Sequence, residues 1–369
     1  FTGAATAFGD KVSNHITTPR QAEQSTLFLS ILLFLDDYLN SLTVGYVMHP
    51  LTDKFKIPRV KLAFIIHSMT APLAMIIPVS SWLAWIIRQI ELSGISLSPS
   101  ENPIIIADPF YVYIKSIPYI FYSLLMIFIT IFVINRRISF GPMADHERIA
   151  EETGNLFGGK KPIRHVLSHE GNTHNSSLID FLFPIFTLIG TTVFGILYTG
   201  GFWMLGGPYS LIQALQHSEI FPILFYSCVI TLTLSIPLFL YHKKISAPQI
   251  PHIFYKGIHL MILAVVMVFF AGIFAALLRE DLKTGEYVAH LLINYFSLQF
   301  LPFLLFVVSA LIATCTGSSW GTMAIMTPFA VPFLIDLLHL QTPTNLDGLC
   351  FLFPCLGAVF SGSVAGDHI

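Results

Sequence analysis

Charged side chains are scarce in this sequence. Of its 369 residues, 11% are Asp, Glu, Lys or Arg, whereas 54% are hydrophobic. A soluble domain carries about 25% charged residues. So little charge cannot cover the water-exposed surface of a chain of this length. The composition therefore indicates a polytopic membrane protein whose main partner is the lipid bilayer.

The sequence also lacks a strong net charge and a cysteine pattern. Its formal net charge is −2 and no basic stripe is present, which argues against a nucleic-acid partner. The four cysteines have no spacing typical of metal ligands, so we expect small buried thiols rather than disulfides or a resident metal. No nucleophile–base or metal constellation indicates an enzyme, and we expect no cofactor.

Long apolar runs of about 20 residues, each enough for one helical crossing, define the expected spans. They predict an all-α fold of transmembrane helices. We treat residues 1–369 as one integral membrane transporter domain, which we expect to be truncated at both ends. The expected spans are Thr26–Met48, Leu62–Ile90, Tyr111–Ile134, Leu178–Tyr198, Ile220–Tyr241, Ile258–Leu278, Val288–Ala313, Thr314–Ile335 and Leu349–Val364.

The basic residues predict an orientation. Lys and Arg gather in the connections 49–61, 135–176 and 242–257, whereas the connections 91–110 and 200–219 contain no Lys or Arg. Cytoplasmic connections carry the excess of Lys and Arg. Residues 135–176 are therefore expected to form a cytoplasmic loop between two halves of a multi-pass protein of the cell (inner) membrane.

Two adjacent acids, Asp36 and Asp37, lie in the middle of the first expected span. An ionised Asp at a helix centre costs about 2.5–3.5 kcal/mol to insert. In a continuous helix, Asn40 would lie on the same face as Asp36, one turn later. Carboxylate and amide oxygens suit Na⁺ or H⁺, so we interpret the group as a cation site. An interhelical hydrogen-bonded network is the structural alternative.

Two of the expected spans contain helix-breaking residues and share a tripeptide. Leu62–Ile90 contains Pro72 and Pro78, followed by Ser80-Ser81-Trp82, and Thr314–Ile335 contains Ser318-Ser319-Trp320 after Thr316 and Gly317. Non-helical backbone at membrane depth is tolerated only inside protein or beside water. Paired interrupted segments indicate a transporter site. Close helix packing through small residues is the alternative.

His67 lies within the first of these interrupted segments. An imidazole titrates near neutral pH and could relay protons. The alternative is a histidine that is simply hydrogen-bonded within the helix bundle.

Several stretches resemble the NhaC-type Na⁺/H⁺ antiporter family of the larger ion-transporter superfamily. They lie in the family's order along nearly the whole chain. The stretches are LDDYLNSLTVGYVMHPLTDKFKIPRVKLAFIIHSMTAP (Leu35–Pro72), PVSSW (Pro78–Trp82), GPMADHER (Gly141–Arg148), TGSSWGTMAIMTP (Thr316–Pro328) and GSVAGDH (Gly362–His368).

The resemblance implies a secondary transporter that exchanges protons for Na⁺. Some members of the family exchange an organic acid or amino acid with such ions. The resemblance also implies a scaffold and a transport domain with re-entrant hairpins, discontinuous helices and inverted repeats. The sequence departs from the family pattern in two ways. The family commonly has an acid where this chain has His67, and the family's motif continues beyond the final Gly-Asp-His. The positions implied as functional are Asp36, Asp37, Asn40, Ser318, Ser319 and Asp367.

We therefore expect an alternating-access antiporter in which Na⁺ and H⁺ compete for the same carboxylate. A Na⁺- or H⁺-coupled transporter of a small organic acid or amino acid is the alternative. The sequence leaves open whether the protein forms a homo-oligomer. The predicted ion-binding and proton-carrying residues are Asp36, Asp37, Asn40, His67, Ser80, Ser81, Thr316, Ser318, Ser319 and Asp367.

Overall fold

The structure is a computed structural model, and it describes most of the chain. The described residues are 16–98, 103–161, 177–216, 218, 220–277, 281, 298–340, 342–346 and 349–369. Within them the chain is all-α, apart from three two-residue parallel strands in the order β1–β2–β3. These strands are Ile95–Ser96, Ile105–Ile106 and Thr344–Asn345.

The chain divides into two compact units, and each combines stretches that are distant in sequence. Unit 1 comprises Phe1–Ala74 and Met126–Ile258, and unit 2 comprises Met75–Leu125 and His259–Ile369. The boundaries between the units fall within three helices of the chain. They are α4 (Arg59–Ile76), α7 (Phe121–Arg136) and α12 (Ile250–Ala276).

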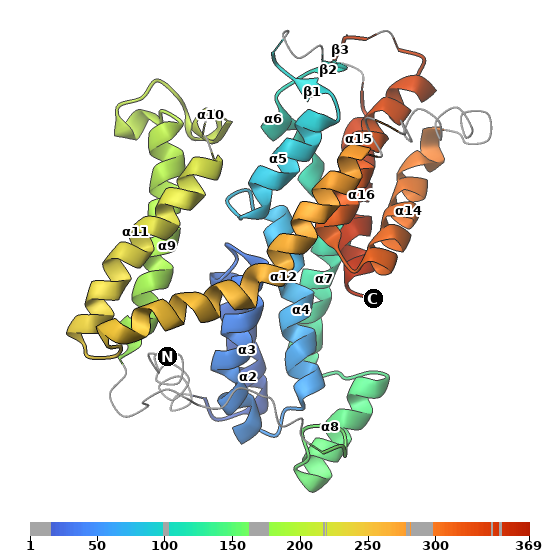
Figure 1. Cartoon of the computed structure of the whole chain (residues 1–369). Coiled ribbons are helices and arrows are strands. Elements are labelled where there is room, and N and C mark those ends of the chain that lie inside the picture. The colour runs from blue at the N-terminus through green and yellow to red at the C-terminus, as the bar shows by residue number, and fades with distance from the viewer. Residues whose placement is uncertain are drawn as a thin grey trace. The chain divides into compact units, whose positions relative to one another are not determined.

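Unit 1 is organised around α2, α3 and the first part of α4, whose apolar side chains pack with the start of α9. Leu29, Val44, Leu51 and Leu62 are at most 5% exposed in this core. Helices α9 and α11 form a second pair, seen side by side in Figure 1. Besides the three helices that contain the boundaries, the helices of unit 1 are α2 (Pro19–Leu32), α3 (Asp37–Lys54), α8 (Pro142–Thr153), α9 (Leu178–Thr199), η4 (Trp203–Leu205), α10 (Leu211–Gln216), α11 (Ile220–Tyr241) and η5 (Ala247–Gln249).

Unit 2 is centred on α16, which is buried along nearly its whole length and packs against α14 and α15 (Figure 1). Its glycines permit a very close approach to α14, since a Cβ at Gly362 or Gly366 would collide with the carbonyl oxygen of Phe306 or Ala310. Small residues have this role in membrane helix packing. Besides the three helices that contain the boundaries, the helices of unit 2 are α5 (Trp82–Leu92), α6 (Pro109–Ser116), η2 (Ile117–Tyr119), η7 (Leu298–Phe300), α14 (Leu301–Thr316), α15 (Ser319–Leu337) and α16 (Leu352–Asp367).

Five of the described helices are long and apolar enough to cross a membrane, and α6–η2 with α7 would add a sixth span bent by 49°. This confirms the predicted all-α, multi-pass fold with discontinuous helices. The five are Arg59–Ile76, Ile179–Thr199, Pro222–Tyr241, Leu298–Thr316 and Ser319–Leu337.

The first expected span, Thr26–Met48, is not a continuous helix. Helix α2 ends at Leu32 and α3 begins at Asp37, so the acids lie at an interruption rather than at a helix centre. The cause is local, because the Asp36 side chain caps α3 and competes with continued helix formation.

The interruption predicted in Thr314–Ile335 is confined to its beginning. Gly317 adopts a left-handed conformation with φ of 62°, and α15 then runs to Leu337 with Pro328 and Pro332 inside it. Of the expected span Val288–Ala313, the residues before 298 lie outside the described part of the chain.

Candidate ion-binding regions at helix interruptions

The first region is the interruption between α2 and α3 in unit 1. Asp36 is the N-cap of α3, and its Oδ1 accepts a hydrogen bond of 2.8 Å from the backbone N–H of Leu39. Asp37 follows as the first helical residue, and both side chains are partly buried. The positive end of the helix dipole stabilises carboxylates at these two positions.

Asn40 joins the two helices across this interruption. Its Nδ2 donates a hydrogen bond of 2.7 Å to the carbonyl oxygen of Ser30 on α2, and the residue is 1% exposed. Its Oδ1 and the Oγ of Ser30 are buried without a hydrogen-bond partner among the described residues. Buried oxygens are normally satisfied, so an unpaired pair of this kind fits cation ligands.

Ser30 is not among the residues predicted from the sequence. It lies ten residues before Asn40, a spacing without meaning in a continuous helix. The one signal available was the Asp-Asp pair, because Asp is a common N-cap and could have marked a helix start.

The second interruption separates α4 from α5 and contains Ser80 and Ser81. Ser80 is buried, and Ser81 occupies the N-cap position of α5 without a capping side-chain hydrogen bond. The hydroxyl of Tyr113 donates a hydrogen bond of 2.8 Å to the carbonyl oxygen of Met75 near the end of α4. Such a bond satisfies a backbone group that the interruption would otherwise leave unpaired.

His67 lies between two and three turns before the end of α4, and its side chain is exposed within the described structure. The structure places it in unit 1, whereas Ser80 and Ser81 belong to unit 2. Its predicted role as a proton relay stays a prediction.

The third interruption separates α14 from α15. Ser318 is the N-cap of α15, and its Oγ accepts a hydrogen bond of 3.2 Å from the N–H of Gly321. Ser319 Oγ instead donates a hydrogen bond of 2.9 Å to Asp367 Oδ2 on α16. Thr316 donates its hydroxyl hydrogen bond to Ile312 within its own helix and is exposed, so the structure does not add it to this group.

The carboxylate of Asp367 occupies the last position of α16, where the helix dipole disfavours a negative charge and favours a nearby cation. It lies against the first residue of α15, whose N-terminal end offsets part of this cost. Next to it, the Nδ1 of His368 lies 3.1 Å from the hydroxyl of Tyr122. The predicted role of Asp367 in binding a cation or a proton stays a prediction.

The two Ser-Ser-Trp tripeptides come together in unit 2. The rings of Trp82 and Trp320 have centroids 5.3 Å apart, and Trp85 lies 5.6 Å from Trp320. The structure therefore brings Ser80, Ser81, Ser318, Ser319 and Asp367 into one unit, while Asp36, Asp37 and Asn40 lie in the other. No cluster of three or more His, Cys, Asp or Glu residues suited to a metal ion occurs among the described residues.

The chain is similar to known proteins over nearly its full length. It is 30% identical over 368 residues to an uncharacterized protein of Haemophilus influenzae, which covers 99% of this chain. The chain spans 66% of that relative's length. No solved structure matches the chain.

A family model described as the Na⁺/H⁺ antiporter family matches residues 73–369. That range includes both Ser-Ser-Trp interruptions and Asp367, while Asp36, Asp37 and Asn40 precede it and fall where the Haemophilus relative extends the similarity. The family model covers far more than half of the chain, and it agrees with the motifs that resemble NhaC-type antiporters. This chain belongs to the Na⁺/H⁺ antiporter family.

Proposed function

We propose that this protein exchanges Na⁺ for H⁺ across the cell membrane by alternating access. Membership of the Na⁺/H⁺ antiporter family and the apolar spans support this proposal. The observation that carries it is the buried Oδ1 of Asn40, which has no hydrogen-bond partner among the described residues, on the helix turn that Asp36 caps.

The α2–α3 interruption offers the oxygen chemistry that a sodium ion requires. Asp36 provides a carboxylate, and Asn40 and Ser30 provide buried neutral oxygens. Na⁺ prefers such hard ligands, and a carboxylate can hold either Na⁺ or a proton but not both. Competition for one carboxylate is sufficient to force exchange when the protein changes conformation only in a loaded state.

We propose that Asp37 and the Ser319–Asp367 pair also take part. Asp37 lies beside Asp36 on a half-buried turn, and Asp367 has an oxygen held by Ser319 at 2.9 Å. A carboxylate at the C-terminal end of a helix favours a cation beside it. Each unit thus contributes one acid-bearing helix interruption.

The proposal is tested by ion flux with the full-length protein in proteoliposomes loaded with a pH-sensitive dye. Na⁺ added outside should drive a pH change inside, and Asp36→Asn or Asp37→Asn should abolish it. Asp145→Asn, at a side chain 67% exposed on α8, is the matched control and should leave the flux unchanged.

Two results would overturn the proposal. One is an unchanged Na⁺-driven flux in both aspartate variants, and the other is a proton flux that requires an organic acid or amino acid but no Na⁺. The second result would support the alternative in which an organic solute is the transported substrate.

A further inference from the structure

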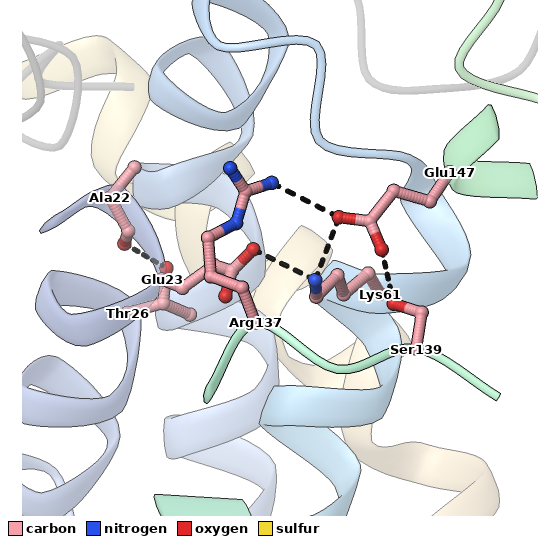
Figure 2. A network of polar contacts seen from close by, with 7 residues as sticks. All are labelled: Ala22, Glu23, Thr26, Lys61, Arg137, Ser139 and Glu147. Carbon is pink, nitrogen blue, oxygen red and sulfur yellow. Dashed lines mark hydrogen bonds and ion pairs between the residues drawn. The ribbon is translucent and has the colours of Figure 1, made fainter. Parts of the chain in front are cut away.

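Unit 1 contains a network of charged residues that shares no residue with the helix interruptions (Figure 2). Lys61 on α4 is fully buried, and its Nζ lies 3.0 Å from Glu23 Oε1 and 2.9 Å from Glu147 Oε1. Glu23 belongs to α2 and Glu147 to α8. The network therefore joins three helices through one ammonium group.

The two carboxylates are not equally satisfied. Glu147 also receives Arg137 Nη2 at 3.1 Å and a short hydrogen bond from the hydroxyl of Ser139. Glu23 is fully buried, and among the described residues Lys61 is its one ion-pair partner and its Oε2 has no hydrogen-bond donor. A buried carboxylate with an unpaired oxygen is costly when ionised.

The pKa values of the two acids are shifted in opposite directions. Burial raises the pKa of Glu23, and the charges of Lys61 and Arg137 only partly offset this effect, while the negative charge of Glu147 adds to it. Burial alone would also raise the pKa of Glu147, but hydrogen bonds from Lys61 and Ser139 and the charges of Lys61 and Arg137 outweigh it and lower that pKa.

Protonation of Glu23 gives the network two charge states. With both acids ionised, Glu23 and Glu147 balance Lys61 and Arg137. With Glu23 neutral, Lys61 and Arg137 remain paired with Glu147, which keeps the stronger set of donors. Neither state leaves a buried charge without a counter-charge, the condition under which buried ions are most destabilising.

We propose that Glu23 is a proton-binding site of this protein, separate from the aspartates at the helix interruptions, where Lys61 shifts from sharing two carboxylates to pairing with Glu147 as Glu23 takes up a proton. The ligand is the proton itself. The site lies next to the basic connection 49–61 and α8. Both belong to the side of the membrane that the distribution of Lys and Arg predicts to be cytoplasmic. The site can therefore respond to cytoplasmic pH whether or not Na⁺ is present.

The test is infrared difference spectroscopy of the purified full-length protein labelled with ¹³C-glutamate, titrated with acid in the absence of Na⁺. A protonated, labelled carboxyl band should appear at a pH above the ordinary glutamate pKa of 4.5 and should be missing in Glu23→Gln. Asp145→Asn, on the exposed face of α8, should leave the band in place.

Two further variants test the network without altering Glu23. Lys61→Met removes the opposite charge and should move the midpoint of the band upward by about 1–3 pH units. Glu147→Gln leaves Lys61 to Glu23 alone and should move the midpoint downward. If the band survives Glu23→Gln, or if neither Lys61→Met nor Glu147→Gln moves it, the proposal is wrong. Because no Na⁺ and no transport enter this measurement, its failure is distinct from failure of the exchange proposal.

Discussion

The indole rings of Trp82 and Trp320 meet edge to face, with centroids 5.3 Å apart and planes inclined at 63°. Each tryptophan ends a Ser-Ser-Trp tripeptide at a helix interruption, and the two tripeptides come from distant parts of the chain. Trp82 is 1% exposed. The contact thus places two interrupted segments in one unit and fixes the starts of α5 and α15 beside one another.

Removing this aromatic contact should destabilise unit 2. Truncation of a buried aromatic side chain typically costs about 3–5 kcal/mol, so Trp82→Ala should lower the free energy of unfolding by that order. Denaturant unfolding in detergent, followed by circular dichroism, measures the change. Trp203→Ala is the control, because Trp203 is 62% exposed and its loss should have little effect. Equal destabilisation by both variants would contradict the packing role of Trp82.

The glycines of α16 should tolerate no side chain. Gly366→Ala would drive a Cβ into the carbonyl oxygen of Ala310 on α14 and should cost about 1–3 kcal/mol through overpacking. Thermal unfolding in detergent measures this loss. Gly190→Ala on α9 is the matched control, because a Cβ there meets nothing within 4 Å. The control should be neutral or stabilising, since Ala favours a helix over Gly by about 1 kcal/mol. A neutral Gly366→Ala would show that α14 and α16 are not in close contact.

The hydrogen bond from Ser319 to Asp367 should tune cation affinity. Hydrogen bonds to charged groups contribute about 1.5–3 kcal/mol, so Ser319→Ala should change the Na⁺ concentration for half-maximal flux at least tenfold. Thr316→Val, at a hydroxyl that bonds within its own helix, should leave this concentration nearly unchanged. The same shift in both variants would indicate a general disturbance rather than a role of the Ser319–Asp367 pair.

The pKa of Glu147 predicts a pH dependence of stability. Because its pKa in the folded protein lies below the ordinary value of 4.5, the ionised carboxylate stabilises the fold at all pH values above that number. The stabilisation is lost as the pH falls through the folded pKa. The difference in unfolding temperature between the wild type and Glu147→Gln should therefore be constant near neutral pH and shrink in strong acid. A difference that grows in acid would contradict this sign.

Composition and apolar runs were sufficient to predict the fold class and most spans. Helix α11 has the predicted bounds, Ile220–Tyr241, and α9 extends the predicted span by one residue. These segments are apolar throughout, so the length of the apolar run is enough to predict each helix. The interruption before α15 was also predictable, because Gly317 in a left-handed turn and Ser318 as N-cap are local features of the sequence.

Tertiary contacts explain what the sequence could not provide. Asp36 and Asp37 were predicted at a helix centre, because hydropathy continues through the interruption that Asp36 itself caps. Lys61 was counted as one basic residue of a connection, although it is fully buried between Glu23 and Glu147 from distant segments. No periodicity links residues so far apart, and their approach depends on how α2, α4 and α8 pack.

The most direct test of the account is proton release on Na⁺ binding by the purified full-length protein in weakly buffered detergent solution. If Na⁺ and H⁺ compete for the two acids at the start of α3, adding NaCl should acidify the solution, whereas choline chloride should not. Asp36→Asn combined with Asp37→Asn should abolish the release, and Asp145→Asn should preserve it. Na⁺ binding without any release of protons, or a release that is unchanged in the double variant, would contradict the account.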